Sequence, residues 1–398
     1  MSELSYLEKL LDGVEVEWLP LSKVFNLRNG YTPSKTKKEF WANGDIPWFR
    51  MDDIRENGRF LGNSLQKISS CAVKGGKLFP ENSILISTSA TIGEHALITV
   101  PHLANQRFTC LALKESYADC FDIKFLFYYC FSLAEWCRKN TTMSSFASVD
   151  MDGFKKFLIP RPCPDNPEKS LAIQSEIVRI LDKFTELTAE LTAELTLRKK
   201  QYNYYRDQLL SFKEGEVEWK TLGEVAVIGT GNHDTQDAIE HGKYIFYARG
   251  REPLKLNVFD FDETAIITAG DGAGVGKVFH YAKGKYALHQ RAYRIVPNAF
   301  MNPRFVYHYI TAYFFTYIQK ASVSSSVTSL RRPMFLKFPI PVPPSEEQAR
   351  IVEILDKFDT LTNSITEGLP REIELRQKQY EYYRDLLFSF PKPETVSN

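Results

Sequence analysis

The 398-residue sequence has few of the features that mark membrane, secreted or metal-binding proteins. No run approaches the ~20 consecutive apolar residues of a membrane span, and the N-terminus lacks the basic-then-apolar order of a signal peptide. We therefore expect a cytoplasmic chain of two or three globular domains. No two cysteines have the close spacing of a zinc site, so we expect them to be reduced core residues. They are Cys71, Cys110, Cys120, Cys130, Cys137 and Cys163.

Catalytic and cofactor motifs are also missing. The run from Gly270 to Lys277 resembles a phosphate loop, but only three residues separate Gly272 from Gly276, and Val278 replaces the magnesium-binding Ser or Thr. The sequence has no dinucleotide fingerprint, no Asn/Asp-Pro-Pro-Tyr/Phe motif for amino methylation, no helicase signature, no His-Glu-x-x-His and no nucleophile elbow. The seven histidines form no ligand-spaced pair. We expect no catalytic residue, no metal site and no cofactor on this chain.

The chain contains an internal repeat. Ile177–Phe184 (IVRILDKF) returns as Ile351–Phe358 (IVEILDKF), with seven of eight positions identical. Arg198–Phe212 (RKKQYNYYRDQLLSF) returns as Arg376–Phe390 (RQKQYEYYRDLLFSF). The offset is 174 residues for the first block and 178 for the second, so the second copy has four more residues between the blocks. In that interval the first copy carries Thr-Ala-Glu-Leu twice in succession, at 188–195, whereas the second copy has Gly368 and Pro370.

A third repeated element links the N-terminus to the middle of the chain. Val16-Glu17-Trp18 returns as Val217-Glu218-Trp219, each after a Leu-Leu pair at nearly the same distance. The N-terminal stretch therefore resembles the end of the repeated helix, which the second copy lacks beyond Phe390. This order predicts a circularly arranged, pseudo-twofold repeat.

The repeated blocks have the periodicity of long amphipathic helices, since apolar residues recur every three or four positions. Each begins after a proline-rich stretch, where helix starts belong. A helix from Ser170 to Phe212 would be ~60 Å long, at 1.5 Å per residue. Two such helices packed antiparallel as a spacer account for this length better than two separate surface helices, the alternative.

Two weakly matching halves, residues 22–162 and 220–343, lie between the helices. Both contain an isoleucine-rich strand, a loop of small residues and, about 14 residues later, a Gln-Arg pair. A shared scaffold with different loops is typical of domains that differ in what they recognise. The loops and pairs are Ser89–Gly93 with Gln106-Arg107, and Asp271–Gly276 with Gln290-Arg291.

Positive charge is concentrated in these two halves, although the whole chain has a net charge of only +1. Residues 22–162 hold 19 Lys/Arg against 13 Asp/Glu, and residues 220–343 hold 15 against 9, so each half carries +6. Two basic modules joined by acidic helices suit a ligand with two phosphate-rich sites.

Aromatic runs at matching places in both halves could stack on bases, but core helices that close each domain explain them better. They are 125–129 in the first half, and 307–309 with 313–315 in the second. The recurring tyrosines of the repeated helices either pack the helix ends or contact partner subunits. They are Tyr202, Tyr204 and Tyr205, and Tyr380, Tyr382 and Tyr383.

Taken together, the two variable domains, the duplicated helices and the tandem Thr-Ala-Glu-Leu resemble the specificity subunit of a type I restriction-modification enzyme of the IC subfamily, over essentially the whole chain. The resemblance implies an α+β fold in which two mixed α/β target recognition domains are separated by two long antiparallel coiled-coil helices. It divides the chain into an N-terminal segment (1–21), recognition domain 1 (22–162), a central spacer helix (163–219), recognition domain 2 (220–343) and a C-terminal helical region (344–398).

The resemblance also implies partners. These are double-stranded DNA, two modification subunits that bind S-adenosylmethionine, and restriction subunits that use ATP and magnesium. The present chain would then be a non-catalytic DNA-recognition subunit, with adenine-N6 methylation and cleavage on the other subunits. The alternatives left open by the residues are a self-sufficient DNA methyltransferase or nuclease with an unfamiliar site, and a bivalent peptide-binding scaffold.

Side-chain chemistry selects the candidate DNA contacts. Arg pairs with guanine and Asn or Gln with adenine in the major groove, while other Lys and Arg bind phosphates. Glycines in the second loop, Gly276 among them, would let the backbone approach DNA closely. In domain 1 the candidates are Tyr31, Thr32, Ser34, Lys35, Arg50, Ser89, Thr91, Gln106, Arg107, Ser144 and Ser145. In domain 2 they are Arg249, Arg251, Asp271, Gly272, Gly274, Lys277, Gln290, Arg291, Ser325, Ser326, Arg331 and Arg332.

The tandem tetrapeptide is expected to act as a ruler between the two recognition domains. The resemblance associates two units with a nonspecific spacer of about six base pairs between the half-sites, and three units with about seven. The ruler residues are Thr188, Ala189, Glu190, Leu191, Thr192, Ala193, Glu194 and Leu195.

Overall fold

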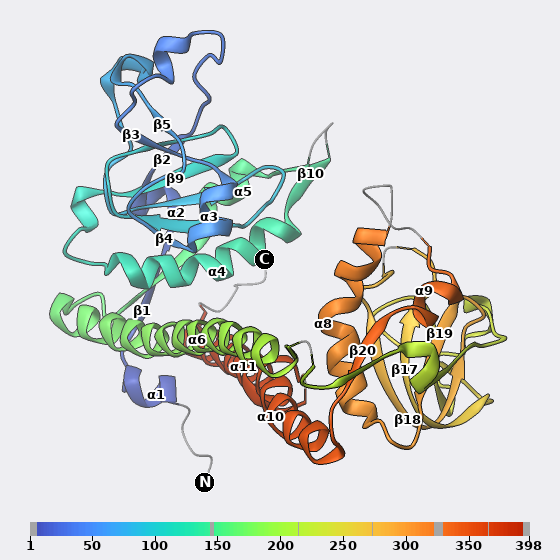
Figure 1. The fold of residues 1–398 in the computed structure, drawn as a ribbon. Coiled ribbons are helices and arrows are strands. Elements are labelled where there is room, and N and C mark those ends of the chain that lie inside the picture. The colour runs from blue at the N-terminus through green and yellow to red at the C-terminus, as the bar shows by residue number, and fades with distance from the viewer. Residues whose placement is uncertain are drawn as a thin grey trace. The chain divides into compact units, whose positions relative to one another are not determined.

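The chain forms two compact units (Figure 1). The computed structural model describes residues 6–143, 147–213, 215–272, 274–321, 329–364 and 366–392. Unit 1 comprises Met1–Ala189 with Leu375–Asn398, and unit 2 comprises Glu190–Glu374. Within the described ranges, no helix is long and apolar enough to cross a membrane. By this division, the C-terminal segment from Leu375 onward belongs to the same unit as the N-terminal half.

Unit 1 is built on a five-stranded sheet in the order β2-β9-β6-β7-β4, with a three-stranded sheet β5-β3-β8 beside it. Residues alternate between two cores along β6, since Ile84 and Ile86 pack with helix α4 and Leu85 packs with Trp48. The elements are α1 (Tyr6–Leu11), β1 (Val16–Pro20), α2 (Leu21–Val24), β2 (Phe25–Asn29), β3 (Ile46–Phe49), α3 (Met51–Asn57), β4 (Phe60–Leu61), β5 (Lys67–Ile68), β6 (Ser83–Ser87), β7 (His95–Ile98), β8 (Leu103–Ala104), β9 (Phe108–Leu113), α4 (Ile123–Lys139), β10 (Thr141–Met143), β11 (Ala147–Val149), α5 (Met151–Lys156) and β12 (Leu158–Pro162).

Unit 2 repeats this plan with a six-stranded sheet in the order β14-β19-β17-β18-β15-β16. Along β17, Ile266 packs with helix α8, while Ala265 and Ile267 belong to the core on the other face. The elements are β13 (Glu218–Thr221), α7 (Leu222–Val225), β14 (Ala226–Thr230), β15 (Tyr244–Tyr247), β16 (Leu254–Leu256), β17 (Phe261–Ala269), β18 (Phe279–Leu288), β19 (Ala292–Pro297), α8 (Pro303–Ala321), α9 (Arg332–Leu336) and β20 (Pro339–Val342).

The aromatic runs form core helices, as predicted. Phe125 and Phe127 of α4 are buried against the sheet of unit 1, and Phe305 and Phe314 of α8 are buried in unit 2. These side chains supply much of the apolar area that each unit buries, so they are not available to stack on bases. Three of the cysteines, Cys110, Cys130 and Cys137, are also buried, whereas Cys71 is exposed.

The chain termini complete unit 1 in the way that the circular repeat predicts. Leu7 and Leu11 of α1 lie in one core cluster with Phe388 and Phe390 from the end of the chain. The indole Nε1 of Trp18 donates a hydrogen bond to the carbonyl oxygen of Pro391 at 2.9 Å. Segments near the two ends of the described sequence therefore pack together in unit 1.

The first long helix, α6 (Pro167–Leu209), is continuous for 43 residues, close to the predicted span of 170–212. The second is interrupted, because α10 (Ser345–Asn363) ends before α11 (Gly368–Leu387) begins. Gly368 has φ +79°, and a Cβ atom there would lie 2.4 Å from the carbonyl oxygen of Thr360. The second copy therefore consists of two shorter helices, with a break where the first copy carries its tandem tetrapeptide.

Two equivalent aromatic contacts hold these helices. In unit 1, Phe184 of α6 stacks on Tyr383 of α11 with ring centroids 5.4 Å apart and planes inclined by 26°. In unit 2, Tyr205 of α6 stacks on Phe358 of α10 at 5.6 Å and 26°. Helix α6 thus meets α11 first and α10 second, the order of an antiparallel pairing. These tyrosines pack the helices, one of the two roles predicted for them.

A buried glutamine joins each long helix to the start of its core helix. The Gln174 side chain accepts a hydrogen bond from the Asp122 amide at 2.9 Å and donates one to the Cys120 carbonyl at 2.9 Å. In unit 2, Gln348 accepts from the Asn302 amide at 2.7 Å and donates to the Pro343 carbonyl at 2.9 Å. Both glutamines are essentially inaccessible to solvent, so each backbone group would lose its partner if the amide were removed.

We expect Gln174→Met and Gln348→Met each to lower the free energy of unfolding by about 1–3 kcal/mol, because methionine fills the space but leaves buried backbone groups unpaired. Denaturant unfolding of the full chain measures the loss, and hydrogen exchange at residues 120–125 or 300–305 assigns it to one unit. Gln377→Met, at an exposed position of α11, is the matched control and should change stability by less than about 0.5 kcal/mol. Equal losses in all three variants would contradict the role assigned to the buried amides.

Candidate nucleic-acid interface

The two Gln-Arg pairs occupy the same position in the two units. Each follows a parallel strand pairing, Trp48 with Leu103 in unit 1 and Phe246 with Ala287 in unit 2. The backbone amide of the next residue then donates to the strand opposite: Asn105 to the Phe49 carbonyl and His289 to the Tyr247 carbonyl, both at 3.0 Å. The sequence landmark therefore corresponds to one structural turn, which is built twice.

A side chain locks each turn from within. The Arg107 amide donates to Oδ1 of Asn105 at 3.0 Å, and the Arg291 amide donates to Nδ1 of His289 at 2.9 Å. Burial lowers the pKa of His289, which keeps its ring neutral and Nδ1 able to accept. Asn105 and His289 were not among the predicted residues, although each directly precedes a Gln-Arg pair.

A glycine allows each turn to lie close to the neighbouring strand. A Cβ atom on Gly30 would lie 2.1 Å from the Asn105 carbonyl oxygen, and one on Gly231 would lie 1.9 Å from the Leu288 carbonyl oxygen. No side chain fits at either position. A signal for this pair was present in the sequence, because Gly30 and Gly231 each follow the repeated Val-Glu-Trp at the same distance.

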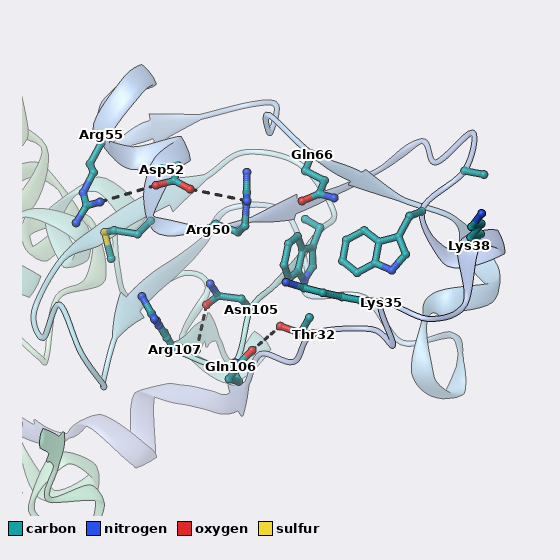
Figure 2. A pocket seen from close by; sticks show the side chains of 14 residues that line it. Thr32, Lys35, Lys38, Arg50, Asp52, Arg55, Gln66, Asn105, Gln106 and Arg107 are labelled. Carbon is teal, nitrogen blue, oxygen red and sulfur yellow. Dashed lines mark hydrogen bonds and ion pairs between the residues drawn. The ribbon is translucent and has the colours of Figure 1, made fainter. Parts of the chain in front are cut away.

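In unit 1 the turn opens onto a polar surface hollow of about 810 Å³ (Figure 2). Five of the predicted DNA contacts line it: Thr32, Lys35, Arg50, Gln106 and Arg107. The remaining nine residues are not among the predicted contacts, and of these Lys38, Arg55 and Gln66 have the chemistry of phosphate or base contacts. The other six are Trp41, Ala42, Trp48, Met51, Asp52 and Asn105.

Arg50 is held at the start of helix α3. Its amide donates to the buried Asp53 carboxylate at 2.6 Å, and the Leu65 amide donates to the other oxygen of that carboxylate at 2.6 Å. The Arg50 guanidinium lies 3.8 Å from Asp52, which also faces Arg55 at 3.8 Å. The strand β3 therefore ends in a short helix that projects two arginines along the hollow, as Figure 2 shows.

The other predicted residues of unit 1 are dispersed. Tyr31 has a structural role, since its hydroxyl donates to the Ala72 carbonyl at 3.2 Å and accepts from the Lys74 amide at 2.8 Å. The Ser34 hydroxyl bonds to that of Thr36 at 2.8 Å. Thr91 lines a neighbouring hollow with Arg55, Arg59 and Arg138. Ser89 lies in a bridge to Ser148. Ser144 and Ser145 lie outside the described residues.

In unit 2 the structure brings three predicted residues together around one carboxylate. Oδ1 of Asp271 accepts from Arg249 at 2.9 Å, and Oδ2 accepts from Arg291 at 3.1 Å. Partial burial raises the pKa of Asp271, but the hydrogen bonds from the two arginines outweigh it and hold the pKa below its usual value. Nearby, Gln290 donates to Asp234 at 2.8 Å. The Asp271 carboxylate is therefore ionised at neutral pH, between two cations.

The remaining residues of unit 2 are placed less closely. Arg331 and Arg332 begin helix α9 and are exposed, as is Arg251. The Lys277 ammonium lies 4.9 Å from the centre of the Phe315 ring. Ser325 and Ser326 lie outside the described residues.

The predicted glycines of unit 2 differ in their surroundings. A Cβ atom on Gly274 would lie 2.8 Å from the Arg249 carbonyl oxygen, and one on Gly276 would lie 2.5 Å from Ile318. Internal packing thus accounts for these two. Gly272 has φ +84° with nothing within 4 Å of a Cβ atom, so it is the one of the three with open space around it.

The tandem tetrapeptide lies inside the uninterrupted helix α6. Leu187, Leu191 and Leu195 are half-buried at a spacing of four residues. The Thr188 hydroxyl donates to the Phe184 carbonyl at 2.8 Å, and Glu194 pairs with Arg198 at 2.7 Å. The eight ruler residues therefore all belong to one continuous helix.

Comparisons with known proteins agree with this architecture. The family described as Type I restriction modification DNA specificity domain matches residues 13–197 and 214–375. A crystal structure of a Type-I restriction-modification system S subunit from M. genitalium superposes with a TM-score of 0.58 at 16% identity, covering 96% of this chain and 98% of that chain. At this low identity the structural similarity shows the fold.

Two relatives from Escherichia coli are similar over nearly their whole length. The chain is 68% identical over 378 residues to the Type I restriction enzyme EcoprrI specificity subunit, covering 92% of this chain and 93% of the relative. It is 42% identical over 443 residues to the EcoR124I/EcoR124II specificity subunit, covering 100% of both. Specificity subunits of this family bind no cofactor themselves, and catalysis belongs to partner subunits. The chain belongs to the DNA specificity subunits of type I restriction-modification systems.

Proposed function

We propose that this chain recognises a bipartite DNA site, with one half read by each recognition domain. The domains are 22–162 and 220–343, flanked by the segments 1–21, 163–219 and 344–398. The observation that carries the proposal is the duplicated turn, which presents Gln106-Arg107 and Gln290-Arg291 on the same frame in two domains of net charge +6 each. Membership in the specificity family decides against a self-sufficient enzyme and against a peptide scaffold.

Each domain lays its turn and neighbouring loops in the major groove, where all four base pairs present different donor and acceptor patterns. Arginine forks bind the O6 and N7 acceptors of guanine, and glutamine binds adenine. Lys35, Lys38 and Arg55 lie around the unit 1 hollow at positions suited to phosphates, which set register without reading sequence. The loops that differ between the domains therefore determine which bases each half-site contains.

The complex contains two modification subunits that carry S-adenosylmethionine, and restriction subunits that use ATP and magnesium, in the cytoplasm. Two recognition domains related by a pseudo-twofold repeat support two copies of the methylating subunit. The eight-residue tandem in α6 sets a nonspecific spacer of about six base pairs between the half-sites.

The modular part of this proposal is tested by domain exchange. Replacing residues 22–162 with the corresponding domain of a relative that has a different target should change one half of the site and leave the other half intact. Sequencing of methylated adenines in cells that express the chimera with its modification subunits gives both halves at once. A reciprocal exchange of residues 220–343 is the control and should alter the opposite half. Simultaneous change of both halves would contradict independent reading.

The arginines of the two turns are expected to contribute directly to binding. Arg107→Ala or Arg291→Ala should weaken binding of the assembled complex by about 1–3 kcal/mol and relax the preference at one base pair. Fluorescence anisotropy with cognate and single-substituted duplexes measures both effects. Lys139→Ala, at an exposed end of α4, is the control and should leave affinity unchanged. Unchanged affinity together with a lower melting temperature would assign these arginines to the fold instead.

A further inference from the structure

One position next to the Gln-Arg turn differs between the two units although its backbone is the same. Ser89 follows β6 in unit 1, and Asp271 follows β17 in unit 2. Each lies in an isolated antiparallel bridge, Ser89 with Ser148 and Asp271 with Ser329. The residue before it donates its amide to the carbonyl of the turn arginine: Thr88 to Arg107 at 2.9 Å and Gly270 to Arg291 at 2.8 Å.

The side chains at positions 89 and 271 differ in charge and in the residues with which they pair. The Asp271 carboxylate binds both Arg249 and Arg291, whose side chains are 42% and 63% exposed. Ser89 has a short neutral hydroxyl, and the Arg107 guanidinium is in no ion pair within the described part of unit 1. In the described part of unit 1, the Arg107 guanidinium is thus available to bind an anion. The Arg291 guanidinium is already paired with the Asp271 carboxylate.

We infer that the residue at position 89 or 271 determines how strictly the neighbouring turn arginine discriminates between base pairs. Asp271 makes unit 2 require a G·C pair at one position of its half-site. The inference rests on the proposed function, in which these turns enter the major groove. Its ligand is a guanine–cytosine base pair at a fixed position of the second half-site.

Electrostatics makes the carboxylate a filter against nonspecific contacts. A DNA phosphate that approaches Arg249 or Arg291 also approaches Asp271 and is repelled by its negative charge. Binding to phosphate would leave the acid without its arginine partners, which is costly once water is excluded. A free arginine such as Arg107 meets no such penalty.

Hydrogen-bond chemistry makes the same group compatible with one base pair. Guanine offers the O6 and N7 acceptors that a guanidinium fork binds, and its paired cytosine offers the N4 amino donor that a carboxylate accepts. A G·C pair therefore satisfies Arg291 and Asp271 together. At an A·T pair, adenine N6 could donate to the acid, but the arginine would lose one of its two acceptors.

Ser89 and Asp271 occupy equivalent positions in the two units, so each can be replaced by the residue that the other unit carries. Asp271→Ser makes unit 2 resemble unit 1, and Ser89→Asp places an acid beside Arg107. Asp262→Ser is the control, since it removes one exposed acid from β17 without touching the arginines. All variants are studied in the assembled complex with modification subunits, by titration of cognate and scrambled duplexes over a range of salt and by sequencing methylated adenines.

Asp271→Ser should strengthen binding to scrambled duplex and steepen the salt dependence by one phosphate contact, a slope change of about 0.9, or on the order of eightfold between 1 M and 0.1 M salt. Methylated sites should then lose their G·C requirement at one position of the second half-site only. Ser89→Asp should weaken scrambled binding and act on the first half-site alone. Asp262→Ser should leave the methylated sequence and the ratio of cognate to scrambled affinity unchanged.

Unchanged discrimination in both exchange variants, with the bipartite site still methylated, would overturn this inference and leave the proposed function standing. Equal weakening of cognate and scrambled binding by Asp271→Ser, with a lower melting temperature, would show that Asp271 is only a structural ion pair. Failure of the unaltered complex to methylate a bipartite site would instead contradict the proposed function itself.

Discussion

The organisation of this protein depends on a single helix that belongs to two packed units. The first part of α6 stacks through Phe184 on Tyr383, and the later part stacks through Tyr205 on Phe358, with nearly identical geometry. Buried glutamines then tie the long helices to the two core helices. Because a helix rises by a fixed ~1.5 Å per residue, a sequence change between these contacts alters a length without altering either packed unit. In the proposed function, the length of α6 sets the distance between the half-sites, and the recognition domains set the sequence of each half-site.

The two units share one backbone frame around the Gln-Arg turn, but the side chains that surround this turn differ. Strand pairings, a glycine that permits close approach and a locked turn recur in both units, whereas the residues around the turn differ in kind. In unit 1 the turn opens onto a hollow with several cations, and in unit 2 an aspartate holds two arginines. A frame fixed by backbone hydrogen bonds tolerates such changes, because few of the altered side chains support the core.

Sequence patterns predicted the features that depend on periodicity and repetition. These include the long helices, the aromatic core helices, the circular use of the termini and the equivalence of the Gln-Arg pairs. The break between α10 and α11 was not predicted, although Gly368 and Pro370 lie beside it, since a helical period alone does not show where a helix ends. The locks at Asn105 and His289 are local, since each side chain accepts from the amide two residues later, but the residue types alone do not show that the chain turns there. The close approach of the two glycines to the opposite strand and the bridging role of Asp271 depend on contacts between residues far apart in sequence. The repeated spacing marks the glycines but does not show what they contact.

The most direct test of the account is to lengthen α6 within the ruler. A third Thr-Ala-Glu-Leu inserted after Leu195 adds ~6 Å of helix and overshoots a full turn by only ~40°, so the apolar seam is kept. One base-pair step adds ~3.4 Å and turns the groove by ~35°. Sequencing of methylated adenines should then show both half-sites unchanged and a spacer about one to two base pairs longer. An unchanged spacer, with both half-sites still methylated, would contradict the claim that α6 sets the distance between them.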